Sequence, residues 1–278
     1  MDKYLSKRSS LAYPYILWAL GFTVIPLVVI VRYAILDTSG AFTLSNITAI
    51  VSPANLKALI FSLEIALGCT LICIILAYPL VMGLRNLKFK GQRPTVFFLI
   101  LPMWMNFILK LLAWQMILSS NGILNLMLEK LGLSRLNIAN SFLSIMIGVV
   151  YDYLPYMVLP LYNAISAIDD DVIEAAEDLG ARRFTVFSKI IFPLSLPGLM
   201  SGITMVFVPS MTSFVTADIL GGGKLQLVGN IIEQEFVQSM DWNMGAGLSV
   251  ALMIFVLMSM AFTVEKDDNS QKQEETAW

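Results

Sequence analysis

Residues Asp169–Pro193 read DDDVIEAAEDLGARRFTVFSKIIFP, a charged stretch with a helical pattern that separates two long apolar runs. Val172, Ala175, Ala176 and Leu179 recur at i, i+3, i+4 and i+7, the spacing that places side chains on one face of an α-helix. The acidic residues between them fall on another face. The stretch is therefore expected to contain a short helix with one apolar and one acidic face.

The ends of this helix are marked by residues with suitable properties. Asp171 is the expected N-cap, and Glu174, three residues later, gives an Asp variant of the capping box. Gly180 is the expected stop, because glycine tolerates the left-handed conformation that often ends a helix. We expect a second short helix before Pro193, which opens the next apolar run at a position where a helix needs no backbone N–H.

The composition of the whole chain is that of a membrane protein. The 278 residues are 57% hydrophobic and 14% charged, with a mean hydropathy of +0.76, whereas charged residues make up about 25% of an ordinary soluble domain. A soluble protein this apolar would lack the polar surface needed to cover itself. The expected fold class is an all-α membrane protein with several spans, surrounded by membrane lipid.

The same composition excludes several function classes. No histidine is present, which excludes Ser-His-Asp catalysis and histidine-dependent metal sites. Cys69 and Cys73 lie one helical turn apart in an apolar run, as small packing residues do, so they are not interpreted as a metal or redox pair. No basic patch with interleaved aromatic residues indicates a nucleic-acid partner. No catalytic or metal-binding residue is therefore assigned.

Six apolar segments are long enough for a membrane helix, which needs about 20 mostly apolar residues. They run approximately over Tyr13–Val31, Ala58–Leu84, Thr95–Leu118, Phe142–Ile165, Leu194–Leu220 and Met244–Val264. The predicted organisation is an N-terminal segment (1–12), a six-helix membrane domain (13–264) that includes the loop 169–193, and a polar tail (265–278). Between spans, Ile123–Leu133 and Gln226–Asp241 are expected to hold short helices, and Gly198 with Gly202 would allow another helix to approach closely.

The distribution of Lys and Arg predicts the orientation, because cytoplasmic connections carry an excess of positive residues. With the N-terminus inside, the inner segments carry twelve Lys and Arg residues and the outer ones five, with Lys110 within a span. The inner residues are Lys3, Lys7, Arg8, Arg85, Lys88, Lys90, Arg93, Arg182, Arg183, Lys189, Lys266 and Lys272. Both termini and the loop 169–193 are therefore expected in the cytoplasm.

The loop resembles the EAA loop of bacterial ABC-importer permeases, whose motif is Glu-Ala-Ala, three residues, Gly, nine residues, then Ile-x-Leu-Pro. The matching residues are Glu174, Ala175, Ala176, Gly180, Ile190 and Pro193. Phe192 stands where the family usually has Leu. The resemblance implies the type I ABC importer permease fold, with the loop, including Asp171, docked on a partner ATPase; the alternative is an ordinary amphipathic hairpin in a loop.

Further segments resemble the PotB-type permease subunits of spermidine/putrescine importers: Leu101–Asn125, Val150–Ile165, Leu227–Phe236 and Asp241-Trp242. This resemblance implies a bacterial cell-membrane protein that translocates a polyamine. It also implies a second, PotC-like permease subunit, a cytoplasmic ABC ATPase dimer and an extracytoplasmic polyamine-binding protein. No cofactor is expected in this chain, since ATP and Mg would be bound by the ATPase.

No energy-harvesting site is expected in the chain itself. Gly221–Lys224 reads GGGK but lacks the following Ser or Thr of a phosphate-binding loop. Ionisable residues within spans are rare and are candidates for function. The candidate substrate path consists of Glu64, Trp104, Lys110, Tyr151, Asp152 and Asp218.

Two interpretations of these residues stay open. In one, Lys110 forms a structural ion pair with Asp152 or Glu64; in the other, the carboxylates and nearby aromatic rings face the path of a cation. Two other functions are also weighed. The same machinery could carry another solute, such as an inorganic anion or ferric ion, with Lys110 as ligand, or the chain could be an ion-coupled transporter working alone, a class that often shows inverted repeats.

Overall fold

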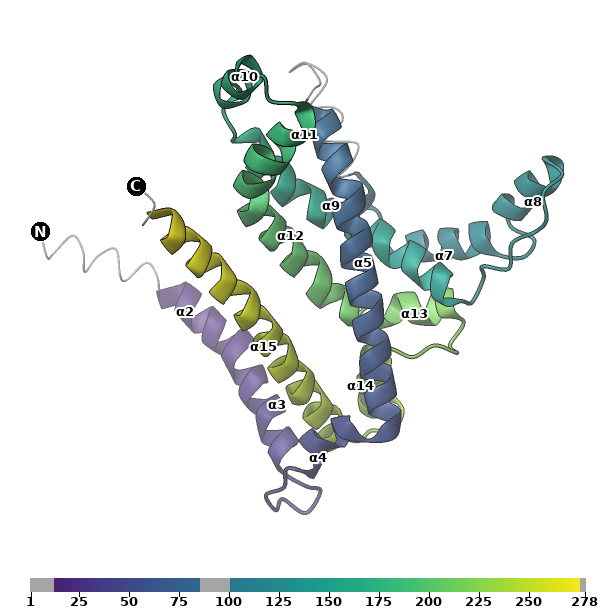
Figure 1. Cartoon of the computed structure of the whole chain (residues 1–278). Helices are drawn as coiled ribbons and strands as arrows, with labels where there is room; N and C mark the ends of the chain where they lie inside the picture. Colours follow the sequence, from purple (N-terminus) through teal and green to yellow (C-terminus); the bar gives the residue numbers. More distant parts are fainter. Residues whose placement is uncertain (1–12, 86–100, 276–278) are drawn as a thin grey trace, which may run out of the picture. The chain divides into compact units, whose positions relative to one another are not determined.

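The structure is a computed structural model that describes residues 13–85 and 101–275, with side chains described for 14–85 and 101–260. In these ranges the regular elements are helices, and one isolated β-bridge joins Leu36 to Phe42. The predictions for residues 1–12, for Lys88, Lys90 and Arg93, and for 276–278 lie outside the described residues. The described elements confirm the expected all-α class (Figure 1).

Six helical segments have the length and apolar composition to cross a membrane, as predicted. They are Pro14–Ala34, Pro53–Arg85, Phe107–Lys130, Phe142–Ser166, Arg183–Met211 and Trp242–Met260. The second, fourth and sixth each lie within one α-helix: α5 (Pro53–Arg85), α9 (Phe142–Ser166) and α15 (Trp242–Glu275). α15 continues through residues 265–275, expected to be a frayed tail, because that stretch is rich in the helix formers Glu, Lys and Gln.

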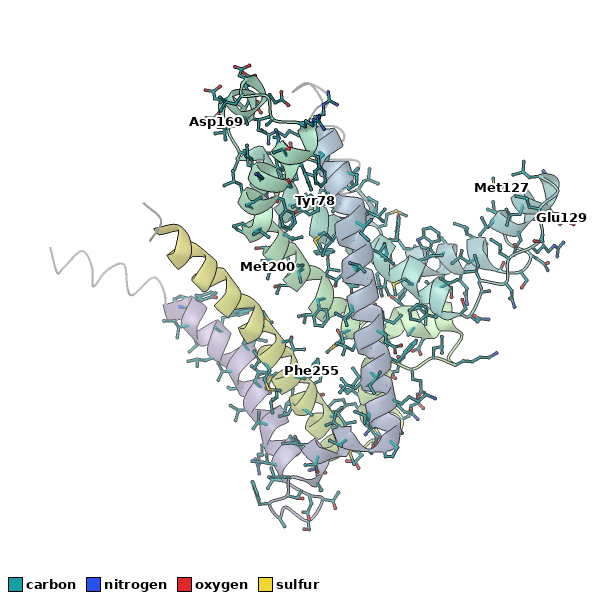
Figure 2. The ribbon with its side chains drawn as sticks, in the orientation of Figure 1. Tyr78, Met127, Glu129, Asp169, Met200 and Phe255 are labelled. Atoms are coloured by element: carbon teal, nitrogen blue, oxygen red, sulfur yellow. The ribbon has the colours of Figure 1, made fainter. Side chains whose placement is uncertain are left out.

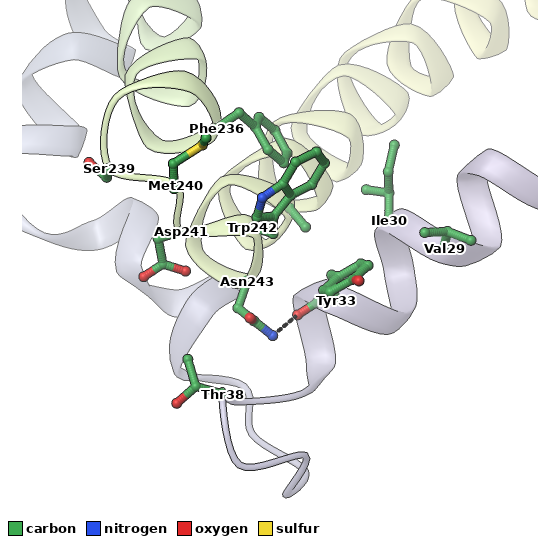
Figure 3. A pocket seen from close by; sticks show the side chains of 11 residues that line it. Val29, Ile30, Tyr33, Thr38, Phe236, Ser239, Met240, Asp241, Trp242 and Asn243 are labelled. Carbon is green, nitrogen blue, oxygen red and sulfur yellow. Dashed lines mark hydrogen bonds between the residues drawn. The ribbon is translucent and has the colours of Figure 1, made fainter.

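Among the described residues, one compact unit consists of 13–57 and Ile231–Met258. Its helices include α2 (Tyr13–Ala19), a π-helical turn (Leu20–Val24), α3 (Ile25–Ile35), α4 (Ser45–Thr48) and a 3₁₀ turn (Ala49–Val51). α3 packs beside α15 through buried Ala34, Ala246 and Val250. Asn243 donates to the carbonyl oxygens of Tyr33 (3.2 Å) and Leu36 (2.7 Å), which fixes the start of α15 against the end of α3 (Figure 3).

The described residues of Ala58–Asn230 make up most of the other unit, whose core lies among α5, α9 and α12 (Phe192–Met211). α12 approaches α9 closely at the two predicted small residues. A Cβ on Gly198 would lie 2.7 Å from the Pro160 carbonyl oxygen, and one on Gly202 would lie 2.7 Å from the Met157 sulfur. The close approach predicted for Gly198 and Gly202 is confirmed, and α9 is the partner helix.

The third predicted span, Thr95–Leu118, is wrong as a single helix. A 3₁₀ turn (Leu101–Trp104) precedes α7 (Phe107–Leu118), and residues 95–100 lie outside the described part of the chain. The Asn106 side chain caps α7 by accepting from the Leu109 N–H at 3.1 Å, so the helix begins there. α8 (Ile123–Lys130) follows Gly122, which confirms the predicted short helix after this span.

The fifth predicted span, Leu194–Leu220, is also divided. α12 ends at Met211, and α13 (Phe214–Gly221) begins after Thr212 and Ser213. The Thr212 hydroxyl bonds the Pro209 carbonyl at 3.3 Å, a local side-chain bond of the kind that competes with helical hydrogen bonds. The predicted break at Gly221–Gly223 is confirmed by positive φ at Gly222 and Gly223, and α14 (Val228–Val237) is the short helix expected after it.

Candidate functional site

The loop that resembles the EAA motif begins with α10 (Asp170–Asp178), which starts earlier than predicted. Asp169, not Asp171, is the N-cap: its Oδ1 accepts from the Asp171 N–H at 3.2 Å. Asp169 has an extended backbone, whereas Asp171 already lies in the first helical turn, so it cannot cap. Asp170 and Asp171 instead place negative charge near the positive end of the helix dipole.

The end of α10 has the geometry predicted for it. Gly180 has φ of +82°, and its N–H donates to the Glu177 carbonyl at 2.9 Å. The next N–H, of Ala181, donates to the Ala176 carbonyl at 3.0 Å. These two bonds form a Schellman motif, which satisfies the last carbonyls of the helix and fixes the direction of the chain.

α10 buries a different face from the one expected. Ile173 and Ala176 pack against the core of this chain, while Val172 and Ala175 are exposed. Leu179 is 90% exposed. The predicted apolar face is therefore split: Ile173, on the neighbouring stripe, lines a cavity with residues of α5 and α11 (Arg183–Val186). In Figure 2, Asp169 is labelled where this hairpin leaves α9.

The second short helix expected before Pro193 is not a separate element. α11 runs through a π-helical turn (Phe187–Ile191) directly into α12, and the Phe192 N–H bonds the Phe187 carbonyl. Pro193 has no N–H to continue the α-helical ladder, and a wider turn just before it accommodates this. Ile190 packs on the core, so the end of the motif is the beginning of a long helix.

Arg85, at the end of α5, binds the segment where the hairpin begins. Its guanidinium donates to the carbonyl oxygens of Ile165 and Ile168, both at 3.0 Å, and to Asp170 Oδ1 at 2.7 Å. One side chain thus joins α5, the end of α9 and the start of α10. The sequence indicated Arg85 only as one of the cytoplasmic positive residues; its place directly after an apolar span was the only signal of this role.

A cavity of about 420 Å³ lies between α5, α10 and α11. It is lined by Met82, Arg85, Asp170, Ile173, Glu174, Glu177, Arg183, Val186 and Ile191. Glu174, the first residue of the motif, therefore faces a cavity with charges of both signs. The hairpin is supported at its base and leaves this charged space beside the motif.

Within the membrane helices, the structure forms one of the two ion pairs considered for Lys110. Its Nζ lies 2.7 Å from Asp152 Oδ1, and each residue is 8% exposed. The same Nζ lies 5.8 Å from the Phe107 ring centroid and 5.9 Å from that of Tyr151. Trp114 packs edge-on against Tyr151 with centroids 5.3 Å apart. Lys110 of α7 is thus held by α9 through charge and aromatic contacts.

The structure brings Lys110, Tyr151 and Asp152 together and leaves the other candidates apart. Glu64 is exposed on α5, and Trp104 is 83% exposed. Asp218 accepts from the Asn230 side chain at 2.7 Å on an exposed face of α13. Among the described residues, no hydrogen bond, ion pair or ring contact links these three to the Lys110–Asp152 pair.

The two cysteines behave as packing residues. Cys69 and Cys73 are fully buried in the core, with their sulfur atoms 3.9 Å apart on adjacent turns of α5. Within residues 14–85 and 101–260, no group of three His, Cys, Asp or Glu side chains is arranged to hold a metal ion.

The family model described as the binding-protein-dependent transport system inner membrane component matches residues 70–265. The chain belongs to this family. This permease is 34% identical to the spermidine/putrescine transport system permease protein PotB of Haemophilus influenzae, over 87% of each chain. It is 37% identical to the PotB protein of Escherichia coli strain K12, over 85% of this chain and 89% of the other.

Solved structures show the same fold. A chain of a bacterial alginate ABC transporter, in complex with a periplasmic protein bound to an alginate pentasaccharide, superposes on this permease with a TM-score of 0.81. The alignment covers 94% of this permease and 93% of that chain at 16% identity, so it shows the fold alone. The permease is a multi-pass protein of the bacterial inner membrane, as expected, and it serves a transport system that depends on a binding protein.

Proposed function

We propose that this permease is one membrane-spanning subunit of an ATP-driven importer for polyamines. The observation that carries the proposal is 34–37% identity, over at least 85% of this chain, to permeases named for spermidine and putrescine. Its partners would be a second, PotC-like permease subunit, an extracytoplasmic polyamine-binding protein and a cytoplasmic ABC ATPase dimer. ATP and Mg would be bound by that ATPase, and both termini of the permease would be cytoplasmic.

The hairpin Asp169–Pro193 is the proposed docking element for the ATPase. Val172 on α10 and Leu179 at its C-cap are exposed, and Phe184, after Gly180, is 78% exposed. Water-exposed apolar side chains on a helix with well-formed ends are suited to bind a groove in another protein. Ala175, also exposed, would allow that protein to approach closely, whereas Ala176 packs within this chain.

The proposed action of α10 is that of a rigid lever. Its N-cap and its Schellman motif fix its two ends, and Arg85 ties its first turn to α5 and α9. Movement of the ATPase would therefore shift α10 together with two membrane helices. Each motif residue has a proposed role that follows from its position. Asp171 and Glu174 lie on the lever, and Gly180 sets the angle at its end. Ile190 and Pro193 join the hairpin to α12.

The cargo would pass helices that carry negative charge and aromatic rings. Asp152 and Tyr151 form one such group, in which Lys110 is the bound cation, while Glu64, Trp104 and Asp218 lie exposed elsewhere on the chain. An exposed carboxylate within a membrane helix is costly unless it faces water or a partner. Glu64 is therefore proposed to face the second permease subunit or the path between the subunits.

Uptake by the reconstituted importer tests this function. The permease is purified with the second permease subunit and the ATPase, placed in vesicles, and supplied with the binding protein and ATP. Accumulation of labelled spermidine or putrescine that requires ATP is the expected result. Accumulation of another solute but not of a polyamine would contradict the cargo, and polyamine uptake by the permease alone without ATP would contradict the mechanism.

A further inference from the structure

The side chain of Lys110 has the chemistry of one end of the proposed cargo. Four methylene groups ending in a primary ammonium form an aminobutyl group, which is also an end of putrescine and of spermidine. In this permease the ammonium of Lys110 is bound by Asp152 Oδ1 at 2.7 Å and lies near the rings of Phe107 and Tyr151. A carboxylate combined with aromatic faces is a general arrangement for binding organic cations. The surroundings of Lys110 are therefore those of a primary alkylammonium site.

Asp152 has binding capacity that Lys110 does not use. An ionised carboxylate accepts hydrogen bonds at both oxygens. Oδ1 of Asp152 is occupied, but Oδ2 is buried and has no hydrogen-bond partner within the described part of the chain. Buried side-chain oxygens are normally paired. An unpaired oxygen beside an ammonium site is an acceptor on the same carboxylate that Lys110 leaves without a donor.

We propose that Asp152 binds a terminal ammonium group of the transported polyamine and that Lys110 occupies this position between transport cycles. The proposal rests on the proposed function, since it takes a polyamine as cargo. The cargo ammonium first donates to Oδ2 and then competes with Lys110 Nζ for the carboxylate. Lys110 has a flexible stem and returns to Asp152 when the cargo leaves.

This competition serves transport. A site on a transport path must bind its cargo strongly enough to admit it and weakly enough to release it. A lysine tethered beside the carboxylate is always present, so it lowers the affinity for the cargo and displaces it. It also balances the charge of Asp152 when no cargo is bound, which keeps a buried carboxylate acceptable within a membrane helix.

A purely structural ion pair predicts the opposite behaviour in two variants. Lys110→Met removes the ammonium and leaves the carboxylate, whereas Lys110→Met with Asp152→Asn removes both charges. If the pair only stabilises the fold, the single variant is the damaged one, and the double variant recovers because no unpaired charge remains. If Asp152 binds cargo, the single variant keeps part of its uptake, because the polyamine replaces the lost ammonium but is released more slowly. The double variant loses more uptake, because it has no carboxylate to bind the polyamine.

The experiment uses the complete importer in vesicles, with labelled putrescine as the probe. Uptake by Lys110→Met is expected to fall a few-fold, because cargo that no longer competes with Lys110 leaves Asp152 more slowly. Uptake by the double variant is expected to fall about tenfold or more, the scale on which loss of one partner of a buried charge pair acts. The reverse order, or equal uptake by the two variants, would overturn the proposal.

A second experiment measures putrescine binding directly and does not depend on uptake. Putrescine is added to the purified permease–ATPase complex without the binding protein, and its melting temperature is recorded. The shift should be larger for Lys110→Met than for wild type and absent for the double variant, or for Asp152→Asn if the double variant does not assemble. A Lys110→Met complex that fails to assemble even with putrescine present would also overturn the proposal. Wild-type uptake separates the two hypotheses, since the proposed function fails only if the wild type does not take up polyamine.

Discussion

The hairpin Asp169–Pro193 and the Lys110–Asp152 pair are stabilised in opposite ways. In the hairpin, α10 is largely exposed and is fixed by local hydrogen bonds at Asp169 and Gly180, with one tie to Arg85. The pair is buried and joins residues 42 positions apart on different helices. The local hydrogen bonds set the shape of the hairpin from nearby residues, whereas the ion pair forms only if α7 and α9 pack against each other. We therefore expect changes in the hairpin to affect coupling and changes in the helix core to affect assembly.

The largest loss of uptake among the variants should come from Gly180→Val, which changes the hairpin and leaves the Lys110–Asp152 pair intact. A β-branched residue at φ of +82° is strained, although a Cβ there would meet nothing within 4 Å. The angle between α10 and α11 must change, so ATP-dependent uptake should fall about tenfold or more if the lever sets a productive geometry. ATP hydrolysis by the same complex should continue.

Gly132→Val is the matched control for this variant. Gly132 also has a positive φ, +73°, and free space around its Cβ position, but it lies after α8. The Gly132→Val substitution should cause similar local backbone strain, but uptake by this variant should stay near normal. Equal loss of uptake in the two variants would show that strain alone, and not the angle of the hairpin, explains the result.

The next effect should come from Gly198→Val, which tests the core side of the comparison. The new side chain would meet the Pro160 backbone, so overpacking is expected to cost about 1–3 kcal/mol. The melting temperature and the yield of the assembled complex should fall, while the ratio of uptake to ATP hydrolysis in the surviving complex stays normal. Gly83→Val on α5, where a Cβ meets nothing within 4 Å, is the control and should leave the yield unchanged.

Arg85→Ala should have an intermediate effect, because Arg85 links the two regions. Loss of a charged donor to two carbonyls and a carboxylate should loosen α10 by about 1.5–3 kcal/mol. Proteolysis of the hairpin should become faster, and the ratio of uptake to ATP hydrolysis should fall several-fold. Asp170→Asn removes only an ion pair whose carboxylate is largely exposed, a contribution of about 0–1 kcal/mol, and should change little. A larger loss from Asp170→Asn than from Arg85→Ala would argue against anchoring through the carbonyls.

The smallest changes in stability are expected from substitutions of Asp169 and Asp171 at the start of α10, and they should differ between the two residues. Asp169→Ala removes the N-cap and should destabilise the helix by about 0.5–2 kcal/mol. Asp171→Ala removes only a favourable charge near the helix start, about 0.3–1 kcal/mol. Hydrogen exchange of the first-turn amides should therefore increase more in the first variant; the opposite order would restore Asp171 as the cap.

The sequence was sufficient wherever a short stretch determines its own structure. Six spans follow from runs of apolar residues, because every backbone group inside a membrane must be paired within its helix. The stop at Gly180 and the break at Gly221–Gly223 follow from the conformations that glycine adopts. The close helix approach at Gly198 and Gly202 was indicated by their spacing alone. The family motif likewise consists of nearby residues, and the family comparison agrees with it.

Only the tertiary structure decided which partners meet across the fold. Periodicity cannot show that α10 buries Ile173 in place of Leu179, since both lie on apolar stripes and the choice depends on α5 and α11. It cannot choose Asp152 over Glu64 as the partner of Lys110, because the pairing depends on how the helices rotate against each other. Arg85 was missed for the same reason: its two carbonyl acceptors are backbone atoms, which carry no mark in a sequence, and only packing brings them within reach of the guanidinium.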